Sequence, residues 1–310
     1  MVAYAASDAN RATRARRTPN HLLDAAAVCD SSSVQPILVL LGHPIAGNPT
    51  QFMMERAFAR HELDWRYLSV EVLPEHLADA VRGIRAMGFR GGHCADPHKQ
   101  AILPLLDRVG EVARHTGAAN LLIREGRELV GENTEGRGLI ESLRRRVDLA
   151  GKRIVLLGAG RTARAVAVEL ALARPAEIVV VDRAESEGRA LVELLQGGLG
   201  AAATLAVWDG TYPIGPDADA VVCALDPSSE DAQEPLPLNL SQLSCRATVA
   251  DVSFNPPRTW LLREAAERGA ATIDGLEIFL QQSSIDFRLW TGVDPDPEVL
   301  RDAVEEFLEL

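Results

Sequence analysis

The segment that most constrains the fold of this chain is RIVLLGAGRTARAVAVELAL, at residues 153–172. Its pattern is a short apolar strand, a glycine-containing turn and a helix, and Gly158, Gly160 and Ala163 fill the three G-x-G-x-x-G/A positions. In such a unit, the free N–H groups and the positive dipole end of the helix bind a pyrophosphate. The segment therefore predicts a Rossmann-type domain that binds a dinucleotide. The residues expected to contact the cofactor are Gly158, Ala159, Gly160, Arg161, Thr162 and Ala163.

Two neighbouring residues bear on which dinucleotide binds. Asp182 follows the next predicted strand, near the offset of about 20 residues at which a carboxylate hydrogen-bonds the ribose 2′-OH of NAD. Arg183 comes directly after it and would instead attract the 2′-phosphate of NADP. The sequence therefore leaves NAD and NADP open, with a slight preference for NAD.

From Pro36 onward, short apolar runs alternate with helix-length amphipathic segments. This alternation is typical of βα units and a parallel sheet, so the predicted fold class is α/β. The first half is expected to contain strands at 37–41, 65–70 and 90–93, helices at 50–60, 75–87 and 99–106, and a hairpin at 120–124 and 128–131. A helix from about 134 to 150 leads to strands at 154–157, 178–181, 203–207, 220–223 and 248–252. Helices at 276–290 and 298–308 follow.

The order of these elements predicts two domains. Residues 34–135 and 275–310 are expected to form a substrate-binding domain with a mixed, mainly parallel sheet, since the last two helices have no strand between them and could pack back on the first half. Residues 136–274 are the predicted Rossmann NAD(P)-binding domain. Residues 1–33 lack apolar periodicity, which is typical of a disordered head, and the stretch at 226–237 is rich in Pro, Ser and acid, as in a solvated loop.

The composition restricts the class of partner. A net charge of −12 and a pI near 5.1 disfavour binding to nucleic acid, which needs clustered Lys and Arg. No apolar run has the length of a membrane span, and the start lacks a secretory apolar region. The four cysteines are scattered without a CxxC pair, as reduced thiols of a cytoplasmic protein would be. We expect a cytoplasmic protein with a small-molecule substrate, no membrane partner and a monomeric or homodimeric state.

The stretch GGHCADPHKQA, residues 91–101, gathers two histidines, a cysteine, an aspartate and a lysine. A metal site is disfavoured because a strand followed by a helix would splay these side chains, and no second ligand pair has zinc-like spacing. We therefore expect no metal, and Cys94 is interpreted as a buried structural residue. Lys99 follows Pro97, which suits the first position of a helix, but a lysine there is usually solvated.

Several motifs, in order along the chain, resemble those of the shikimate dehydrogenase family. The resemblance runs from about Pro36 to the C-terminus. The motifs are GHPIAGNPT (42–50), GFRGGHCADPHK (88–99), GAAN (117–120), GENTEG (131–136), GAGRTARA (158–165), DGLEIFLQQ (274–282) and LWTG (289–292). So many ordered matches are far more specific than any one of them.

The resemblance implies an NAD(P)-dependent dehydrogenase that interconverts 3-dehydroshikimate and shikimate, or a closely related cyclic polyol acid. Lys99 and Glu135 match the lysine and aspartate that act together on the substrate hydroxyl. Oxidation of a secondary alcohol releases its O–H proton as hydride leaves, and a positioned lysine can take that proton. The matched substrate positions are Asn48, Thr50, His93, Asn120, Thr134, Phe254 and Gln282.

Six of the matched positions depart from the family pattern and imply a divergent substrate pocket. The family has two serines and a tyrosine at the substrate carboxylate, an asparagine and a threonine on the adjoining strand, and an aspartate beside the lysine. Here these are Asn48, Thr50, Phe254, His93, Ala95 and Glu135. The substrate is then shikimate itself or a cyclic polyol that differs at the carboxylate end. Two alternatives remain: an NAD-dependent quinate or shikimate dehydrogenase of catabolism, which Asp182 favours, and a nucleotide-binding sensor without chemistry, which Lys99 disfavours.

Overall fold

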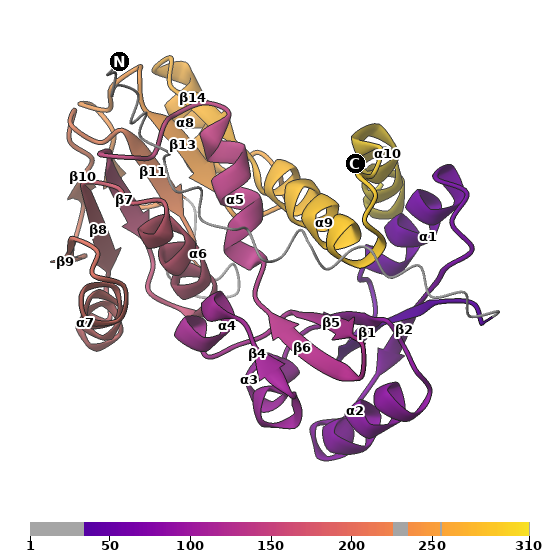
Figure 1. Cartoon of the computed structure of the whole chain (residues 1–310). Helices are drawn as coiled ribbons and strands as arrows, with labels where there is room; N and C mark the ends of the chain where they lie inside the picture. Colours follow the sequence, from indigo (N-terminus) through magenta and orange to yellow (C-terminus); the bar gives the residue numbers. More distant parts are fainter. Residues whose placement is uncertain (1–33, 226–234, 255, 310) are drawn as a thin grey trace, which may run out of the picture.

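The computed structural model describes residues 34–225, 235–254 and 256–309. Two sheets lie side by side, each with helices on both faces, and the helices α5 (Glu135–Arg144) and α9 (Gly275–Thr291) lie between them (Figure 1). The predicted α/β class is confirmed. The predictions of a disordered head at 1–33 and of a solvated loop fall outside the described residues, apart from the last three residues of the loop.

The first sheet is mixed and mainly parallel, as predicted. Its strand order is β2-β1-β3-β5-β6-β4, and only β5 runs antiparallel to its neighbours. The strands are β1 (Ile37–Gly42), β2 (Arg66–Glu71), β3 (Gly91–Cys94), β4 (Arg108–Val109), β5 (Leu121–Glu125) and β6 (Glu128–Glu132). The predicted hairpin is β5 and β6.

Alternate side chains of β1 point to opposite faces of this sheet, so each face has its own core. Leu38 and Leu40 pack with residues of α1 (Thr50–Arg60), α9 and α10 (Pro297–Leu308). Val39 and Leu41 pack with α2 (Leu77–Ala86) and with the segment that follows β3. The C-terminal helices therefore pack on the first half of the chain, and the residue bounds of the two domains stay a prediction.

The second sheet is wholly parallel, with order β14-β13-β11-β7-β8-β9. The chain adds β8 and β9 on one side of β7 and then crosses to build β11, β13 and β14 on the other. Ligands of such sheets bind where the order reverses, at the carboxyl ends of the strands, which here are those of β7 and β11. The strands are β7 (Arg153–Leu157), β8 (Glu177–Asp182), β9 (Ala203–Val207), β11 (Ala220–Cys223), β13 (Thr248–Asp251) and β14 (Ala271–Ile273).

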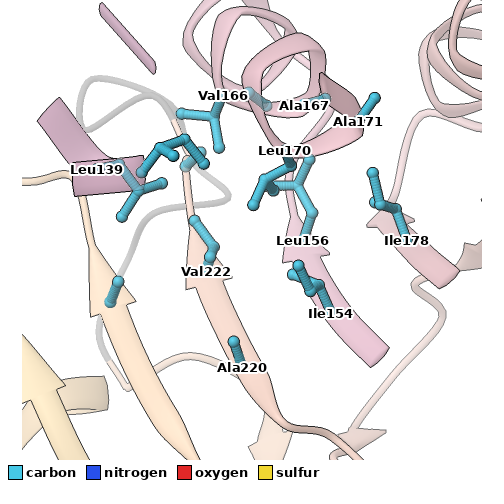
Figure 2. Close-up of a cluster of buried hydrophobic side chains, with 14 of the residues drawn as sticks. Leu139, Ile154, Leu156, Val166, Ala167, Leu170, Ala171, Ile178, Ala220 and Val222 are labelled. Atoms are coloured by element: carbon cyan, nitrogen blue, oxygen red, sulfur yellow. The ribbon is translucent and has the colours of Figure 1, made fainter. Parts of the chain in front are cut away.

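Helices α5, α6 (Arg161–Leu172) and α7 (Glu185–Glu193) cover one face of this sheet. Figure 2 shows Leu139, Val166 and Leu170 of these helices over Ile154 and Val222 of the strands. Helix α8 (Trp260–Glu267) packs on the other face. Strands β10 (Tyr212–Pro213) and β12 (Leu238–Asn239) form a separate two-stranded sheet, whose residues Tyr212 and Leu238 pack in the core on the α8 face of the second sheet.

Strand β3 lies unusually close to both of its neighbours because it begins with two glycines. Gly91 and Gly92 have φ angles of +138° and +149°. A Cβ atom on Gly92 would lie 1.7 Å from the carbonyl oxygen of Val39, and one on Gly91 would lie 2.0 Å from that of Leu122. No side chain fits either space, so the glycines fix the position of the strand that leads to Lys99.

Two more glycines bring α5 into close contact with helices on either side of it. A Cβ atom on Gly136 would lie 2.6 Å from the carbonyl oxygen of Ala165 in α6. A Cβ atom on Gly138 would lie 2.3 Å from the carbonyl oxygen of Ile278 in α9 and 2.8 Å from the backbone nitrogen of Gln282. The close approach at Gly138, called the Gly138 contact below, sets the spacing of α5 and α9.

Candidate active site

Lys99 is the second residue of a short helix, α3 (His98–Ala101), that follows β3. The helix expected at 99–106 is shorter than predicted, because Pro104 has no N–H to continue it, and a 3₁₀ turn at Leu103–Leu105 takes its place. Pro97 is the residue before the helix rather than its first residue. The glycine-fixed strand and this short turn together determine where the Lys99 side chain points.

The Lys99 ammonium lies between two carboxylates. Its Nζ hydrogen-bonds Oε1 of Glu135 in a short contact and lies 3.3 Å from Oδ2 of Asp96. The side chains of Lys99 and Glu135 are 23% and 19% exposed, so the pair is largely shielded from water. Glu135 is the first residue of α5, where the positive end of the helix dipole favours a carboxylate.

Burial alone would lower the pKa of Lys99, because it disfavours the charged ammonium. The negative charges and hydrogen bonds of Glu135 and Asp96 more than offset that effect, so the pKa of Lys99 is raised above 10.5. The side chain is therefore an ammonium at neutral pH, with a proton to donate.

Two hollows meet at this pair. The first, of about 250 Å³, is lined by Lys99, Asp96 and Glu135 on one side and by Gly160 and Arg161 on the other. The second, of about 420 Å³, also has Glu135 and Thr162 in its lining. Its remaining walls come from the carboxyl ends of β11 and β13 and from α9, and are Leu225, Val252, Ser253, Phe254, Gly275, Ile278, Phe279 and Gln282.

The glycine turn fits a dinucleotide pyrophosphate. No atom lies within 4 Å of the Cβ position on Gly160, so the backbone is open to close approach by a ligand. No side chain caps the first turn of α6, which leaves its N–H groups available. Gly158 packs against Ala224, where a Cβ atom would lie 3.0 Å from the carbonyl oxygen. The turn predicted from sequence thus lies at the point where the strand order reverses, beside Lys99.

The two residues that bear on cofactor choice lie at the end of β8. Asp182 accepts a hydrogen bond from the backbone N–H of Ala184 at 2.7 Å, which leaves its second oxygen for a ribose hydroxyl. The guanidinium of Arg183 lies over the ring of Trp208, 5.4 Å from its centroid. Neither residue lines the two hollows.

The predicted substrate residues do not all gather in one place. Gln282 and Phe254 line the second hollow, and the Phe254 ring stacks on Phe279 at a centroid distance of 5.6 Å. Asn120 and Thr134 instead bond each other: the Asn120 side chain donates to Thr134 Oγ1 at 3.0 Å and accepts from its backbone N–H at 2.7 Å. Asn120 therefore fixes the start of α5, next to Glu135, through bonds within the protein.

Asn48, Thr50 and His93 line neither hollow. The Asn48 side chain accepts from the backbone N–H of Thr50 at 2.9 Å, and Thr50 is buried. His93 has partners at both ring nitrogens, Tyr67 and Asp286. The sequence offered no signal for these two partners, which lie 26 and 193 residues away along the chain.

Two residues near Lys99, Asp96 and Asn133, were not assigned a catalytic or binding role from the sequence. Asp96 was weighed only as a metal ligand, although its spacing of three residues before Lys99 places a carboxylate beside the ammonium. Asn133 is fully buried, accepts from the backbone N–H of Glu135 at 3.2 Å and lines the first hollow with Thr116. Cys94 is buried, which agrees with a structural thiol. Among the described residues, no three His, Cys, Asp or Glu side chains gather as a metal site.

Fold and site together define a class of protein. A glycine turn on a parallel sheet lies across a hollow from a shielded lysine–carboxylate pair, the arrangement of a nicotinamide-nucleotide-dependent dehydrogenase that acts on a CH–OH group. The comparisons make the assignment specific, because the chain belongs to the shikimate dehydrogenase family. Residues 40–122 match the shikimate dehydrogenase substrate binding domain.

The relatives match nearly the whole chain. The shikimate dehydrogenase (NADP(+)) of Moorella thermoacetica is 37% identical over 273 residues, 87% of this chain and 92% of the relative. That of Geobacter metallireducens is 35% identical over 272 residues, 86% of this chain and 95% of the relative. The family predicted from ordered motifs is thereby confirmed, and the chain is an NAD(P)-dependent oxidoreductase.

Two solved structures are also similar. The ligand-free 5-ketofructose reductase of Gluconobacter sp. strain CHM43 superposes with a TM-score of 0.83 at 35% identity, over 89% of this chain and 99% of that one. The shikimate 5-dehydrogenase of Listeria monocytogenes, in complex with shikimate and NAD, gives a TM-score of 0.80 at 26% identity, over 88% and 97%. In the described part of this chain, no helix is long and apolar enough to cross a membrane.

Proposed function

We propose that this enzyme interconverts shikimate and 3-dehydroshikimate, or a closely related cyclic polyol and its ketone, with NAD or NADP. The observation that carries the proposal is the Lys99–Glu135 pair facing the Gly160 turn across the first hollow. The shikimate bound in the Listeria relative and the NADP dependence of the Moorella relative support the substrate and cofactor classes.

The bound nicotinamide would take or give the hydride, and the chain supplies the proton transfer and the binding. In the direction of reduction, the Lys99 ammonium donates its proton to the oxygen of the former ketone, as a general acid. In oxidation, the neutral amine accepts the hydroxyl proton. Glu135 and Asp96 hold the ammonium in place, and Gln282, which lines the second hollow, binds the polyol.

The proposal is tested by following the reduction of NAD and of NADP by the purified enzyme with shikimate and with quinate, side by side. We expect turnover of shikimate. The activity should persist when metal ions are chelated and when thiols are alkylated, because the proposed chemistry uses neither. Tight binding of a dinucleotide without oxidation of these or any neutral polyol would contradict the proposal and favour a nucleotide-binding sensor.

The raised pKa of Lys99 predicts different pH profiles for the two directions. Oxidation needs the neutral amine, whose fraction grows about tenfold per pH unit below the pKa, so kcat/KM for oxidation should rise between pH 7 and 9. Reduction needs the ammonium, which persists until the pH passes the raised pKa, so its kcat/KM should stay nearly constant over that range. Initial rates in both directions measure this, and a fall in reduction between pH 7 and 9 would contradict it.

For the cofactor, we propose a slight preference for NAD, because Asp182 ends β8 with one carboxylate oxygen available for a ribose hydroxyl. Replacing Asp182 by Ala removes a charge-assisted hydrogen bond worth about 1.5–3 kcal/mol, so the ratio of kcat/KM for NAD over NADP should fall by about 10- to 100-fold. Asp209→Ala, at an exposed residue after β9, is the matched control. An unchanged ratio in Asp182→Ala would show that this carboxylate does not select between NAD and NADP.

A second candidate function is the reduction of an acyclic polyhydroxy ketone. The similarity to the 5-ketofructose reductase favours it. So do Asn48, Thr50 and Phe254, which stand where the shikimate dehydrogenase pattern has two serines and a tyrosine at the substrate carboxylate. The reaction type and the role of Lys99 would be the same, and only the substrate skeleton would differ. NADPH or NADH oxidation with 5-ketofructose, compared with 3-dehydroshikimate, distinguishes the two candidates.

A further inference from the structure

Tyr67, His93 and Asp286 form a hydrogen-bonded cluster, called the His93 trio below. Apart from the Lys99–Glu135 pair, it is the feature that bears most on which substrate the enzyme prefers. Nδ1 of His93 lies 2.5 Å from the Tyr67 hydroxyl, and Nε2 lies 3.0 Å from Oδ2 of Asp286. Tyr67 and Asp286 are both 0% exposed. The ring of Trp290 packs edge-on against His93 at a centroid distance of 4.7 Å, so the imidazole is held by Tyr67, Asp286 and Trp290.

The protons of the His93 trio can be placed from its hydrogen bonds. Burial, and then the negative charge of Asp286, raises the pKa of Tyr67 well above 10, so Tyr67 is a neutral phenol. Among the described residues its hydroxyl has one hydrogen-bond partner, Nδ1 of His93, so the phenol donates and Nδ1 accepts. The ring proton is then on Nε2 and points to Asp286. A doubly protonated ring would leave the buried phenol proton without an acceptor, which is costly.

With a neutral imidazole, the His93 trio carries one net negative charge, on Asp286. One oxygen of that carboxylate, Oδ1, has no hydrogen-bond partner within the described residues, so few donors disperse the charge. Asp286 is one helical turn after Gln282 on α9, which places their Cβ atoms about 5–6 Å apart. Gln282 lines the second hollow, so the buried charge lies close behind its wall.

Little positive charge on the substrate side balances this carboxylate. The lining of the second hollow contains no Lys or Arg and one acid, Glu135. Lys99 is contacted by both Glu135 and Asp96, and Arg161, on the far side of the first hollow, is 3.9 Å from Asp96. A substrate carboxylate in the second hollow would therefore meet a like charge with no Lys or Arg in the lining of that hollow to balance it.

We propose that the His93 trio makes this enzyme select an uncharged polyol over a polyol acid, with Asp286 as the specificity-determining residue and Tyr67 and His93 as positioning residues that keep its charge uncompensated. The inference rests on the proposed function, since it names the charge class of the same substrate. The physical cause is repulsion between the Asp286 carboxylate and a substrate carboxylate across the wall of the second hollow. This repulsion is strongest where water cannot solvate the charges.

The test compares shikimate with its primary amide, which matches the acid in shape and lacks its charge. In the wild-type enzyme, kcat/KM for oxidation of the amide should exceed that of the acid by about tenfold, the effect of a like charge about 10 Å away at an effective dielectric constant near 20. Asp286→Asn keeps a hydrogen-bond acceptor for His93 and removes the charge, so the amide-to-acid ratio should fall toward one while KM for the dinucleotide stays unchanged.

Two further variants separate the charge from a merely structural role. Tyr67→Phe removes the phenol that donates to Nδ1 of His93, so the ring can carry a proton on both nitrogens and balance Asp286. This variant should therefore also lower the amide-to-acid ratio. Asp294→Asn, at an exposed residue paired with Arg288 beyond the end of α9, is the control and should leave the ratio unchanged.

The outcomes also distinguish this inference from the proposed function. Equal or better use of the acid by the wild-type enzyme, or an unchanged ratio in Asp286→Asn, overturns the inference and leaves the proposed function standing. If neither compound is oxidised while a dinucleotide binds, the proposed function fails. The shift of the thermal-unfolding midpoint produced by each compound then decides the inference: a larger shift with the amide supports it, and equal shifts overturn it.

Discussion

Replacing Lys99 by Ala should lower kcat/KM in both directions by about 10³-fold, within the range of about 10² to 10⁴ that a positioned acid or base contributes. The variant removes the group that we propose exchanges a proton with the substrate oxygen, and it takes the ammonium away from Glu135 and Asp96. The binding of the dinucleotide should change little, because the Gly160 turn is on the other sheet. Initial rates and a dinucleotide titration measure both expectations.

The chain offers a closely matched control for this variant. It contains 30 arginines but only two lysines, Lys99 and Lys152. Lys152 is partly exposed and pairs with Asp219 at the start of β7, far from the hollows, so Lys152→Ala should keep full activity. An arginine cannot release its proton near neutral pH, which gives a physical reason for a lysine at position 99 in an arginine-rich chain. Unchanged turnover by Lys99→Ala would rule out the proposed proton transfer.

Replacing Gly92 by Ala should destabilise the folded chain by more than about 4 kcal/mol, among the largest effects expected of a single substitution. The added Cβ would lie 1.7 Å from a backbone oxygen of β1, and the φ angle of +149° is one that side chains rarely adopt. The overlap is with backbone, so no side chain can move aside to relieve it, and β3 must leave its place between β1 and β5. Urea-induced unfolding measures the loss.

Gly197→Ala is the control for this second prediction. Gly197 lies in a helical turn at Leu194–Gly198, has open space at its Cβ position and has no left-handed φ angle. An alanine there should be neutral or stabilise the chain by about 0.5–1 kcal/mol. A Gly92→Ala protein with a wild-type unfolding midpoint would mean that β3 can shift without cost. The orientation of Lys99 would then need another explanation.

The sequence predicted five of the six strands of each sheet. Strands such as β7 and β11 appear as unbroken apolar runs, which parallel sheets between helices require. Short elements were missed where no such run exists: β14 has three residues, and α4 (Glu111–Thr116) has six. The helix expected to end near residue 150 ends at Arg144, although no proline or glycine marks that position.

The site was predictable where one short segment forms it, and not where distant segments meet. The Gly158–Gly160 turn could be found from its own local pattern, whereas Lys99 was assigned only through the resemblance of several ordered motifs to a known family. Asp286 could not, because its relation to His93 depends on how α9 packs over β3, 193 residues earlier in the chain. His93 was expected to face the substrate, but its ring nitrogens are both bonded within the protein. The roles of the individual site residues remain predictions.

The Gly138 contact has a consequence for how substrate preference can change among relatives of this enzyme. It fixes α9, which carries Gln282 and Asp286, against the first turns of α5, which begins with Glu135. The distance from Glu135 to Gln282 and Asp286 is therefore set by backbone packing rather than by the side chains that we propose recognise the substrate. Residues on α9 can be exchanged without moving the reacting pair. The substrate preference of such an enzyme can thus change while the positions of Lys99 and Glu135 stay the same.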